Sequence, residues 1–548
     1  MCIMQITQIQ IHNFKSIKDA QIDCKNYNIL VGKNNAGKSN ILDAVLFYFD
    51  EKKLSPEAFF RTPKKTEDEL WIEVEYQAED DSEISDLPQK YNLGDRRFRV
   101  RRIAQITDFK GDYYGYILDV NGQKKLDDTT SFFGAKNVSK TKLGGIIYIP
   151  ALKDIQDETK TQGSATFAKM LKEIIGDSIS KKKEFIKLSE AIRLLSNSLK
   201  GTDCGTRENR NYNCFAEVEA TLKEELAAWS CEVSIDLEPL DPDKFSQQSA
   251  ELKLIESDGI AMPPSSKGHG LQRALLMSLI KLWAENERKK KIKGDPKKTF
   301  RSSVQILVFE EPEIFLHPPQ QKMLFKDLKT LISDSNIQIL VSSHSPVFLD
   351  EANNDLGSIH TVIKSDNTKI FNVSNGFLAK IQTPDIQRKF RFQWWLNADR
   401  NAAFFSDIVL LVEGNTEKAI LQWLISKNYS NYYPLAITVF DCGGKGFIPY
   451  FMELFGDLNL KHIVIHDDDE NRSADHIKMN AAIQSATNTS TFQIVQVPNN
   501  IEAYLNIPRV DSFKKVGEAM WTLEINGIDP QKESHLINPI INFSKTLS

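Results

Sequence analysis

The chain has 548 residues, of which 41% are hydrophobic and 26% charged, with a formal net charge of −5 and a pI near 6.1. This length exceeds one ordinary hydrophobic core and predicts about two to four domains. The composition excludes a largely disordered chain, and the acidic balance excludes a protein drawn to nucleic acid by its overall charge, so any such contact must come from a local patch.

Sequence signals for export and membrane insertion are missing. No apolar run reaches the roughly 18 residues that a membrane span needs, and the first residues do not place an apolar stretch after a basic one. The six cysteines contain no C-x-x-C pair, which disfavours a zinc ribbon, and they are sparse for a disulfide framework. We therefore expect a cytoplasmic protein with no membrane partner.

The first predicted elements form a strand, a loop and a helix in that order. Residues 3–11 alternate like a half-buried strand, and residues 27–31 (YNILV) suit a buried strand. The next segment, GKNNAGKS, fits the phosphate-binding pattern G-x-x-x-x-G-K-S, and the helical run ILDAVLFYF follows it. A glycine-rich turn without a nucleotide is the alternative.

Such a loop binds ATP through backbone N–H groups, a lysine that reaches the terminal phosphates and a hydroxyl that binds Mg²⁺. We therefore expect Lys38 to contact the phosphates and Ser39 to bind magnesium. The predicted nucleotide-binding residues of the loop are Gly32, Asn34, Asn35, Ala36, Gly37, Lys38, Ser39 and Asn40.

Three later segments have the residues expected of elements that complete an ATP site together with this loop. Residues 304–311 (VQILVFEE) predict a strand that ends in Glu310, expected to hold Mg²⁺, and Glu311, expected to orient the attacking water. The turn SSKGHGLQR, with Ser266 and Gly268, precedes an apolar helix and is typical of a signature loop. His344 follows another apolar strand and is expected to touch a terminal phosphate. The alternatives are carboxylates that cap a loop and a structural histidine.

Six segments together resemble the ABC-type ATPase of the OLD (overcoming lysogenization defect) family, relatives of the RecF and SMC proteins. They are NFKS, GKNNAGKS, YIPALKD, SKGHGLQR, EEPEIFLHP and SSHSP. The resemblance implies that ATP lies between two such domains, with Ser266 and Gly268 of one subunit facing the nucleotide of the other. It therefore implies a homodimer or a larger even-numbered oligomer. No glutamine-loop residue is evident near residues 50–80.

The region between these motifs predicts a helical insert at about 160–235, with helical spacing at 165–200 and 215–228. The resemblance implies that it serves in dimerisation. The basic run at 287–301 is interpreted as a solvated connector. The cysteines at 204 and 214 match no zinc pattern.

The carboxy-terminal third repeats the strand-then-carboxylate pattern. An aromatic segment at 391–405 predicts a connector helix, after which strand 408–412 ends in Glu413 and strand 461–466 leads to Asp467 and Asp469. Three converging carboxylates would repel one another unless divalent cations neutralised them, and such cations can activate water against a phosphodiester. Solvated strand ends are the alternative.

This pattern resembles the Toprim domain, above all that of OLD nucleases, in the segments FFSDIVLLVEGNTE, VFDCGGKG and NNIEAYL. The resemblance implies two divalent metals, Mg²⁺ or Mn²⁺, held by Glu413, Glu417, Asp467, Asp469 and Glu502. It also implies a catalytic lysine, for which Lys515 is the first candidate and Lys514 the second; a surface lysine is the alternative. Glu413 and Asp467 are the carboxylates expected to be essential for cleavage.

The sequence thus predicts an α/β chain with an ABC/RecF-like ATPase domain at 1–395 and a Rossmann-like Toprim nuclease domain at 396–548. The expected function is an ATP-hydrolysing, metal-dependent endonuclease acting on DNA, with RNA as an open alternative. The competing hypothesis is a RecF-like or SMC-like DNA clamp whose Toprim domain is only a scaffold. The resemblance further implies a role in bacterial defence against phage, alone or beside a helicase or a retron reverse transcriptase with its msDNA.

Overall fold

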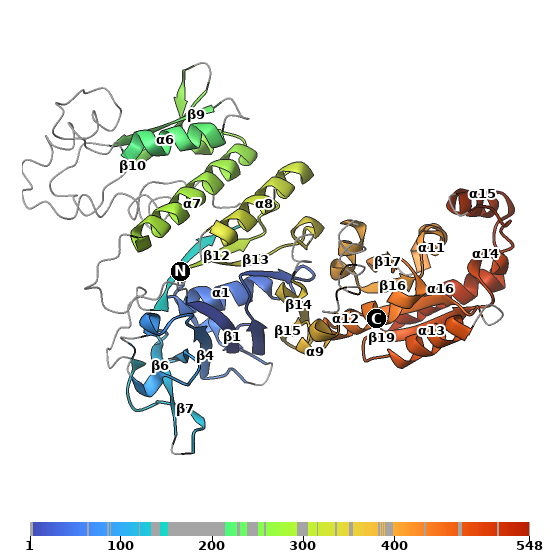
Figure 1. Ribbon diagram of the computed structural model, residues 1–548, viewed down its shortest axis with the longest axis horizontal. Helices are drawn as coiled ribbons and strands as arrows, with labels where there is room; N and C mark the ends of the chain where they lie inside the picture. The colour runs from blue at the N-terminus through green and yellow to red at the C-terminus, as the bar shows by residue number, and fades with distance from the viewer. Residues whose placement is uncertain are drawn as a thin grey trace, which may run out of the picture. The chain divides into compact units, whose positions relative to one another are not determined.

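The computed structural model divides the chain into two compact units (Figure 1). The first comprises Met1–Thr7, Leu42–Leu54 and Glu73–Ser343, and the second comprises Gln8–Ile41, Ser55–Ile72 and His344–Ser548. The residues that the structure describes are 4–62, 65–84, 87, 89–119, 121–132, 143–151, 214–226, 231–237, 250–256, 259–292, 305–314, 316–334, 337–349, 355–381, 384, 386, 388, 398–431, 434–469, 474–511 and 514–546. Most of the predicted insert at 160–235 and part of the basic run at 287–301 lie outside them.

The strands up to residue 372 belong to one large sheet and one small sheet. The order of the large sheet is β7-β6-β5-β4-β1-β2-β15-β14-β3-β13-β12-β8, and that of the small sheet is β11-β10-β9. The strands are β1 (Gln5–Phe14), β2 (Ile17–Asp23), β3 (Tyr27–Val31), β4 (Glu69–Gln77), β5 (Arg97–Gln105), β6 (Asp112–Leu118), β7 (Lys124–Leu126), β8 (Gly145–Ile149), β9 (Cys231–Leu237), β10 (Ala250–Glu256), β11 (Ala261–Met262), β12 (Gln305–Glu310), β13 (Ile337–Ser342), β14 (Ile359–Lys364) and β15 (Thr368–Asn372).

Within the first unit, β12 pairs in parallel with β8 on one side and β13 on the other. Its Val308 lies opposite both Tyr148 and Leu340. Strands buried on both faces are continuous apolar runs, which explains the sequence QILVF before the acidic pair. Helices α7 and α8 pack against each other beside these strands (Figure 1).

Within the second unit, β1 and β2 form an antiparallel hairpin and β14 and β15 form another. Strand β3 pairs in parallel with β14, with Leu30 opposite His360. The helices of this part of the chain, in both units, are α1 (Lys38–Tyr48), η1 (Pro56–Ala58), η2 (Asp81–Ile84), η3 (Gln89–Tyr91), α6 (Cys214–Glu225), η8 (Pro264–Ser266), α7 (His269–Ile292), α8 (Pro318–Asp334), η9 (Pro346–Leu349), η11 (Leu356–Ser358) and α9 (Asn375–Lys380).

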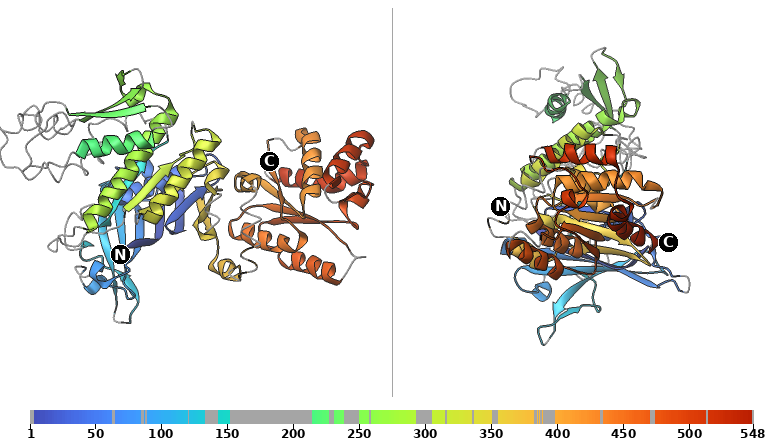
Figure 2. Two further views of the ribbon diagram at one scale, coloured as in Figure 1. Left: turned by 45° about the horizontal axis from the view of Figure 1, so that its top comes forward. Right: turned by 90° about the vertical axis from the view of Figure 1, so that its right-hand side faces the viewer.

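Residues 398–546 form a separate four-stranded sheet, all parallel, in the order β17-β16-β18-β19. Helices cover both faces, with α12 and α13 on one side and α11, α15 and α16 on the other (Figure 2). The elements are η12 (Ala398–Phe405), β16 (Ile408–Val412), α11 (Asn415–Lys427), η13 (Tyr429–Asn431), β17 (Ile437–Asp441), η14 (Lys445–Phe447), α12 (Ile448–Asp457), β18 (His462–Asp467), α13 (Ala474–Ser485), β19 (Thr491–Val497), α14 (Ile501–Tyr504), α15 (Lys515–Asn526) and α16 (Pro530–Lys545).

The core of this sheet explains its strands. Every residue of β16 is buried, and Leu410 and Val412 pack with Ile420 of α11 and Ile540 of α16. Covering both faces of a parallel sheet removes the polar alternation that an exposed strand would show. The α/β prediction is therefore confirmed.

The structure refines the predicted connector helix and leaves the predicted domain boundary untested. The described part of the connector expected at 391–405 is a 3₁₀ helix, Ala398–Phe405, in which Arg400 turns inward to pair with Asp441 at 3.1 Å. The domain boundary at 395/396 stays a prediction. In the part of the chain that the structure describes, no helix is both long enough and apolar enough to cross a bilayer.

Candidate functional site

The phosphate-binding loop requires its two glycines. Gly32 has a φ of +147°, and a Cβ there would lie 2.2 Å from the carbonyl oxygen of Val362. Gly37 has a φ of +106°, and its Cβ would lie 2.3 Å from the hydroxyl of Thr368. A side chain at Gly32 would collide with β14, and one at Gly37 would collide with β15. Packing as well as backbone conformation therefore requires glycine at both positions.

The NFKS segment supports this loop from behind. Asn40 donates to the Ser16 hydroxyl at 2.7 Å, and that hydroxyl bonds to the Thr368 hydroxyl at 2.8 Å. Thr368 in turn donates to the carbonyl of Ala36 at 2.9 Å. The remaining predicted contacts, Asn34, Asn35 and Ser39, are exposed at the loop. The loop is therefore held from β15 while its outer side stays open.

Lys38 is buried with its charged end on backbone oxygens. Its Nζ donates to the carbonyls of Gly32 at 2.9 Å and Lys33 at 3.0 Å. Burial and the nearby Lys38 charge lower the pKa of His344 to about 4. His344 is therefore neutral near pH 7 and can donate one N–H to a phosphate without adding a charge. The structure brings these two predicted residues together.

The other predicted ATPase residues lie in the first unit. Glu310 ends β12, where the Tyr148 hydroxyl donates to its Oε2 at 2.5 Å. Glu311 has a φ of +44°, in the left-handed region, and its N–H donates to the Ser342 carbonyl at 2.8 Å. Such a conformation is uncommon for a residue other than glycine and often occurs at functional positions.

The predicted signature loop lies in the same unit. Ser266 ends η8 with its hydroxyl donating to the Pro263 carbonyl at 2.7 Å. Gly268 precedes α7, and a Cβ added there would meet no atom of the described residues within 4 Å.

The acidic residues of the carboxy-terminal sheet converge at one edge. Glu413 follows β16, Asp467 ends β18 and Asp469 lies two residues later, and one carboxylate oxygen from each lies within 4.8 Å of the others. Strands β16 and β18 are parallel neighbours, so their carboxyl ends meet at the same edge. Carboxylate oxygens are the ligands that Mg²⁺ and Mn²⁺ prefer, and this donor set fits such an ion.

Backbone N–H groups orient these carboxylates. The N–H of Asp467 donates to Glu413 at 2.9 Å, and the N–H of Ile501 donates to Asp467 at 2.9 Å. The N–H of Gly414 donates to Glu417 at 3.0 Å. Each acceptor carboxylate keeps a second oxygen that is not used by these bonds.

The cluster carries more negative charge than its environment stabilises. Burial, and then the charges of Glu413, Glu417 and Asp469, raise the pKa of Asp467 to about 8. Burial raises the pKa of Glu417 to about 7, and Glu413 and Glu502 add to the shift. Glu417 and Glu502 thus lie near enough to act on the group of three electrostatically. A bound cation would reverse these shifts.

Two lysines approach the cluster. Lys515, the first residue of α15, donates to Glu502 at 2.9 Å, whereas Lys514 is exposed. Lys445 lies deeper, with its Nζ 3.2 Å from Asp469. Lys445 belongs to the VFDCGGKG segment, and the sequence pattern predicts no role for it. Tyr148 belongs to the YIPALKD segment, and the pattern does not predict its contact with Glu310.

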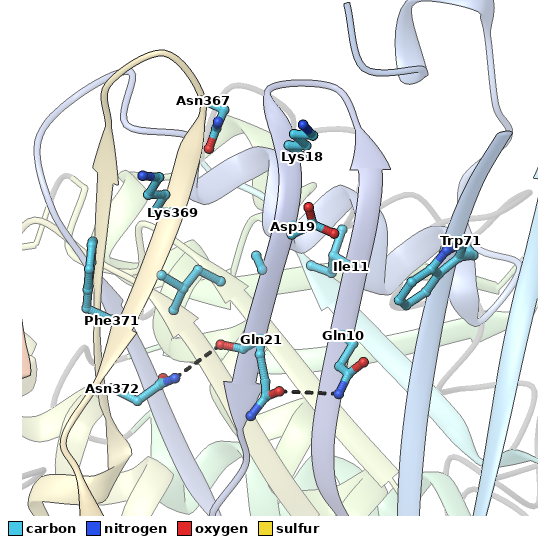
Figure 3. A pocket seen from close by; sticks show the side chains of 12 residues that line it. Gln10, Ile11, Lys18, Asp19, Gln21, Trp71, Asn367, Lys369, Phe371 and Asn372 are labelled. Atoms are coloured by element: carbon cyan, nitrogen blue, oxygen red, sulfur yellow. Dashed lines mark hydrogen bonds between the residues drawn. The ribbon is translucent and has the colours of Figure 1, made fainter. Parts of the chain in front are cut away.

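A shallow groove of about 480 Å³ lies on the face of β1, β2 and β15 in the second unit, with Trp71 at its edge (Figure 3). Lys18 and Lys369 are among its lining residues, together with several amide side chains. None of the residues predicted from sequence as site residues lines it.

Two family models match the chain. The model of the AAA ATPase domain matches residues 4–112 and 107–349, and that of the TOPRIM domain of overcoming lysogenization defect protein-like proteins matches residues 404–469. These matches contain the phosphate-binding loop and the group of three carboxylates respectively.

Curated relatives cover most of the chain. The Old nuclease of Escherichia phage P2 is 25% identical over 98% of this chain and 89% of its own length. The endonuclease GajA of Bacillus cereus VD045 is 25% identical over 85% of this chain and 75% of its own length. The OLD nuclease of Thermus scotoductus is 24% identical over 50% of this chain and 52% of its own length.

Among solved structures, the Smc head domain of Pyrococcus furiosus bound to the C-terminal domain of ScpA is similar to 69% of this chain. The matched region covers 98% of the Smc head chain, with 17% identity and a TM-score of 0.39. The family assignment rests on the sequence matches, which confirm the predicted resemblance. The chain belongs to the AAA ATPase domain family, whose model matches residues 4–112 and 107–349, and it carries an OLD-like TOPRIM domain matched at residues 404–469.

Proposed function

We propose that this protein hydrolyses ATP and is a divalent-metal-dependent endonuclease that cuts DNA. One observation carries the nuclease proposal: Glu413, Asp467 and Asp469 place carboxylate oxygens within 4.8 Å of one another in the TOPRIM domain. The relatives in phage P2 and Bacillus cereus are named nuclease and endonuclease, which supports the same activity here.

The ATPase roles follow from the chemistry of the groups. Lys38 binds the terminal phosphates after leaving the carbonyls of Gly32 and Lys33, which phosphate oxygens replace. Ser39 and Glu310 bind Mg²⁺, Glu311 orients the attacking water, and neutral His344 donates to the terminal phosphate. Ser266 and Gly268 complete the nucleotide site of a second subunit, which makes the active form a homodimer or a larger even-numbered oligomer.

The nuclease roles belong to residues 396–548. Glu413, Asp467 and Asp469 hold one divalent cation, Mg²⁺ or Mn²⁺, and Glu417 and Glu502 contribute to a second. The bound cations supply an activated water and stabilise charge on the phosphodiester. The backbone N–H groups of Asp467 and Ile501 fix the carboxylates, and Lys515 donates to the negative charge that develops as the bond breaks.

The biological role proposed for this activity is defence of a bacterial cell against phage DNA, alone or with a helicase or a retron reverse transcriptase as a partner. The relatives in phage P2 and Bacillus cereus are called nuclease and endonuclease, which supports a nucleic-acid substrate.

A cleavage assay on the full-length protein tests the proposal. Plasmid DNA, single-stranded DNA and RNA are incubated with Mg²⁺, Mn²⁺ or EDTA, using the parent protein, Glu413→Ala and Asp467→Ala. Asp475→Ala is the matched control, because this carboxylate is exposed on α13 and pairs only loosely with Lys478 at 3.4 Å. We expect cutting of DNA by the parent and by Asp475→Ala alone. A parent protein that never cuts with either metal would favour the DNA-clamp hypothesis instead.

A further inference from the structure

Lys445 is a buried ammonium inside a ring of oxygens. Its Nζ donates to the backbone carbonyl of Asp467 at 2.5 Å and to Oδ2 of Asp469 at 3.2 Å. Oε1 of Glu413 lies 3.8 Å away. The Lys445 side chain is only 4% exposed. Lysine is rarely buried to this degree unless it is paired, and here its partners are two of the three carboxylates that form the candidate metal site.

The backbone before Lys445 holds it in this position. Gly443 and Gly444 have φ angles of +73° and +137°, which allow the chain to turn sharply after β17. The N–H of Gly443 donates to Asp441 at 2.6 Å, and the N–H of Gly444 donates to the carbonyl of Glu413 at 2.7 Å. The loop that carries Lys445 is thus tied to the residue that supplies one of the candidate ligands.

The position of Lys445 has an electrostatic consequence. A cluster of buried carboxylates destabilises the fold unless a positive charge lies among them or protons neutralise them. In the metal-free protein the ammonium of Lys445 supplies such a charge. When a divalent cation arrives, the same ammonium repels it and competes for Asp469 and Glu413.

We propose that Lys445 is a built-in counter-ion of the TOPRIM carboxylates, which stabilises the metal-free protein and lowers its affinity for divalent cations. The proposal rests on the proposed metal site and gives Lys445 a role separate from binding or cutting DNA. It stabilises the domain without metal and raises the cation concentration that is needed to occupy the site.

The test compares full-length parent protein with Lys445→Met, Lys445→Arg and the double variant Lys445→Met with Asp469→Asn. Melting temperature is measured in EDTA, and Mn²⁺ binding is measured by calorimetry without nucleotide or DNA. We expect Lys445→Met to melt lower than the parent in EDTA and to bind Mn²⁺ roughly fivefold or more tightly. Lys445→Arg should resemble the parent, because it keeps the charge. The double variant should recover much of the melting temperature in EDTA, because it removes one uncompensated carboxylate.

The outcomes separate the possible errors. Unchanged melting in EDTA, or weaker Mn²⁺ binding by Lys445→Met, would overturn the counter-ion role. Should Lys445→Met fail to fold, a folded double variant supports the role and an unfolded one overturns it. A parent protein that binds no Mn²⁺ refutes the proposed metal site, and the melting data in EDTA then still decide whether Lys445 stabilises the carboxylates.

Discussion

The two candidate sites carry opposite charges, and each balances its charge with internal groups of the opposite polarity. In the phosphate-binding loop, the ammonium of Lys38 rests on the carbonyls of Gly32 and Lys33. In the TOPRIM domain, the carboxylates rest on backbone N–H groups and on the ammonium of Lys445. Each ligand-free site therefore satisfies its charge with an internal group of the same polarity as the expected ligand. An anion should displace the carbonyls at one site, and a cation should compete with the ammonium at the other.

The largest expected effect is a loss of DNA cleavage by the TOPRIM site without a loss of ATP hydrolysis. Asp467→Ala removes a central ligand, so metal-dependent DNA cleavage should fall by roughly 1,000-fold, whereas ATP hydrolysis should stay within about twofold of the parent. Cleavage and phosphate release are measured on the same preparations. Equal losses of both activities would show that the two sites act as one.

Substitutions in the ATPase site should separate nucleotide binding from ATP turnover. Lys38→Ala should lose nucleotide binding, and Glu311→Gln should keep binding but lose roughly 100-fold in turnover. Binding of a fluorescent ATP analogue and steady-state hydrolysis distinguish the two variants. Normal hydrolysis by either would remove that residue from the proposed site.

Lys515→Ala sharpens the division of labour within the TOPRIM site. Because Lys515 contacts Glu502, its loss should slow cutting by roughly 10- to 100-fold while Mn²⁺ binding by the group of three changes little. Lys514→Ala is the matched control from the neighbouring position. A reversed pattern, in which only Lys514→Ala slows cutting, would move the catalytic role to Lys514.

The raised pKa values predict a pH dependence at the acidic site. With a pKa of about 8, Asp467 keeps a proton that an unfolded chain, with an ordinary value of about 3.9, releases. Its contribution to stability without metal is therefore complete at low pH and is lost as the pH rises from about 4 to about 8. Over the same range the Mn²⁺ affinity should rise, by up to about tenfold per pH unit for each proton released.

Melting temperatures in EDTA and Mn²⁺ titrations between pH 5 and 9 measure both trends. Asp467→Asn, which cannot ionise, should flatten the stability profile. A parent profile that is already flat would contradict the assignment of a protonated carboxyl to this cluster.

Tyr148→Phe should give the smallest effect. It removes one hydrogen bond to the Glu310 carboxylate and leaves the ring in place, so the Mg²⁺ concentration for half-maximal ATP hydrolysis should rise by roughly tenfold or less. Nucleotide affinity without Mg²⁺ should not change. An unaltered Mg²⁺ requirement would reduce Tyr148 to a packing role.

Some residues of the two sites can be predicted from the sequence, whereas others are identified only by the fold. Most residues of the phosphate-binding loop are contiguous, and Gly32 and Gly37 occupy positions that no other residue fits, so the pattern identifies the loop directly. Glu413 and Asp467 could be predicted because they follow apolar strands, and carboxyl ends of parallel strands meet. Each of these inferences needs only local sequence and one topological rule.

The contacts of Lys445 and Tyr148 needed the fold. A lysine after two glycines usually lies in solvent, and only the turn at Gly443 and Gly444 directs this one inward. Tyr148 meets Glu310 because β8 and β12 pair in a particular register, although the two residues are far apart in sequence. The 3₁₀ form of Ala398–Phe405 likewise depends on the inward turn of Arg400 toward Asp441.

The most direct test of two separate sites is Mn²⁺ binding without nucleotide, measured by calorimetry on the parent protein, Lys38→Ala and Asp467→Ala. We predict that the parent and Lys38→Ala bind Mn²⁺ with the same affinity and that Asp467→Ala loses this binding. Equal binding by Asp467→Ala, or its loss in Lys38→Ala, would contradict the account.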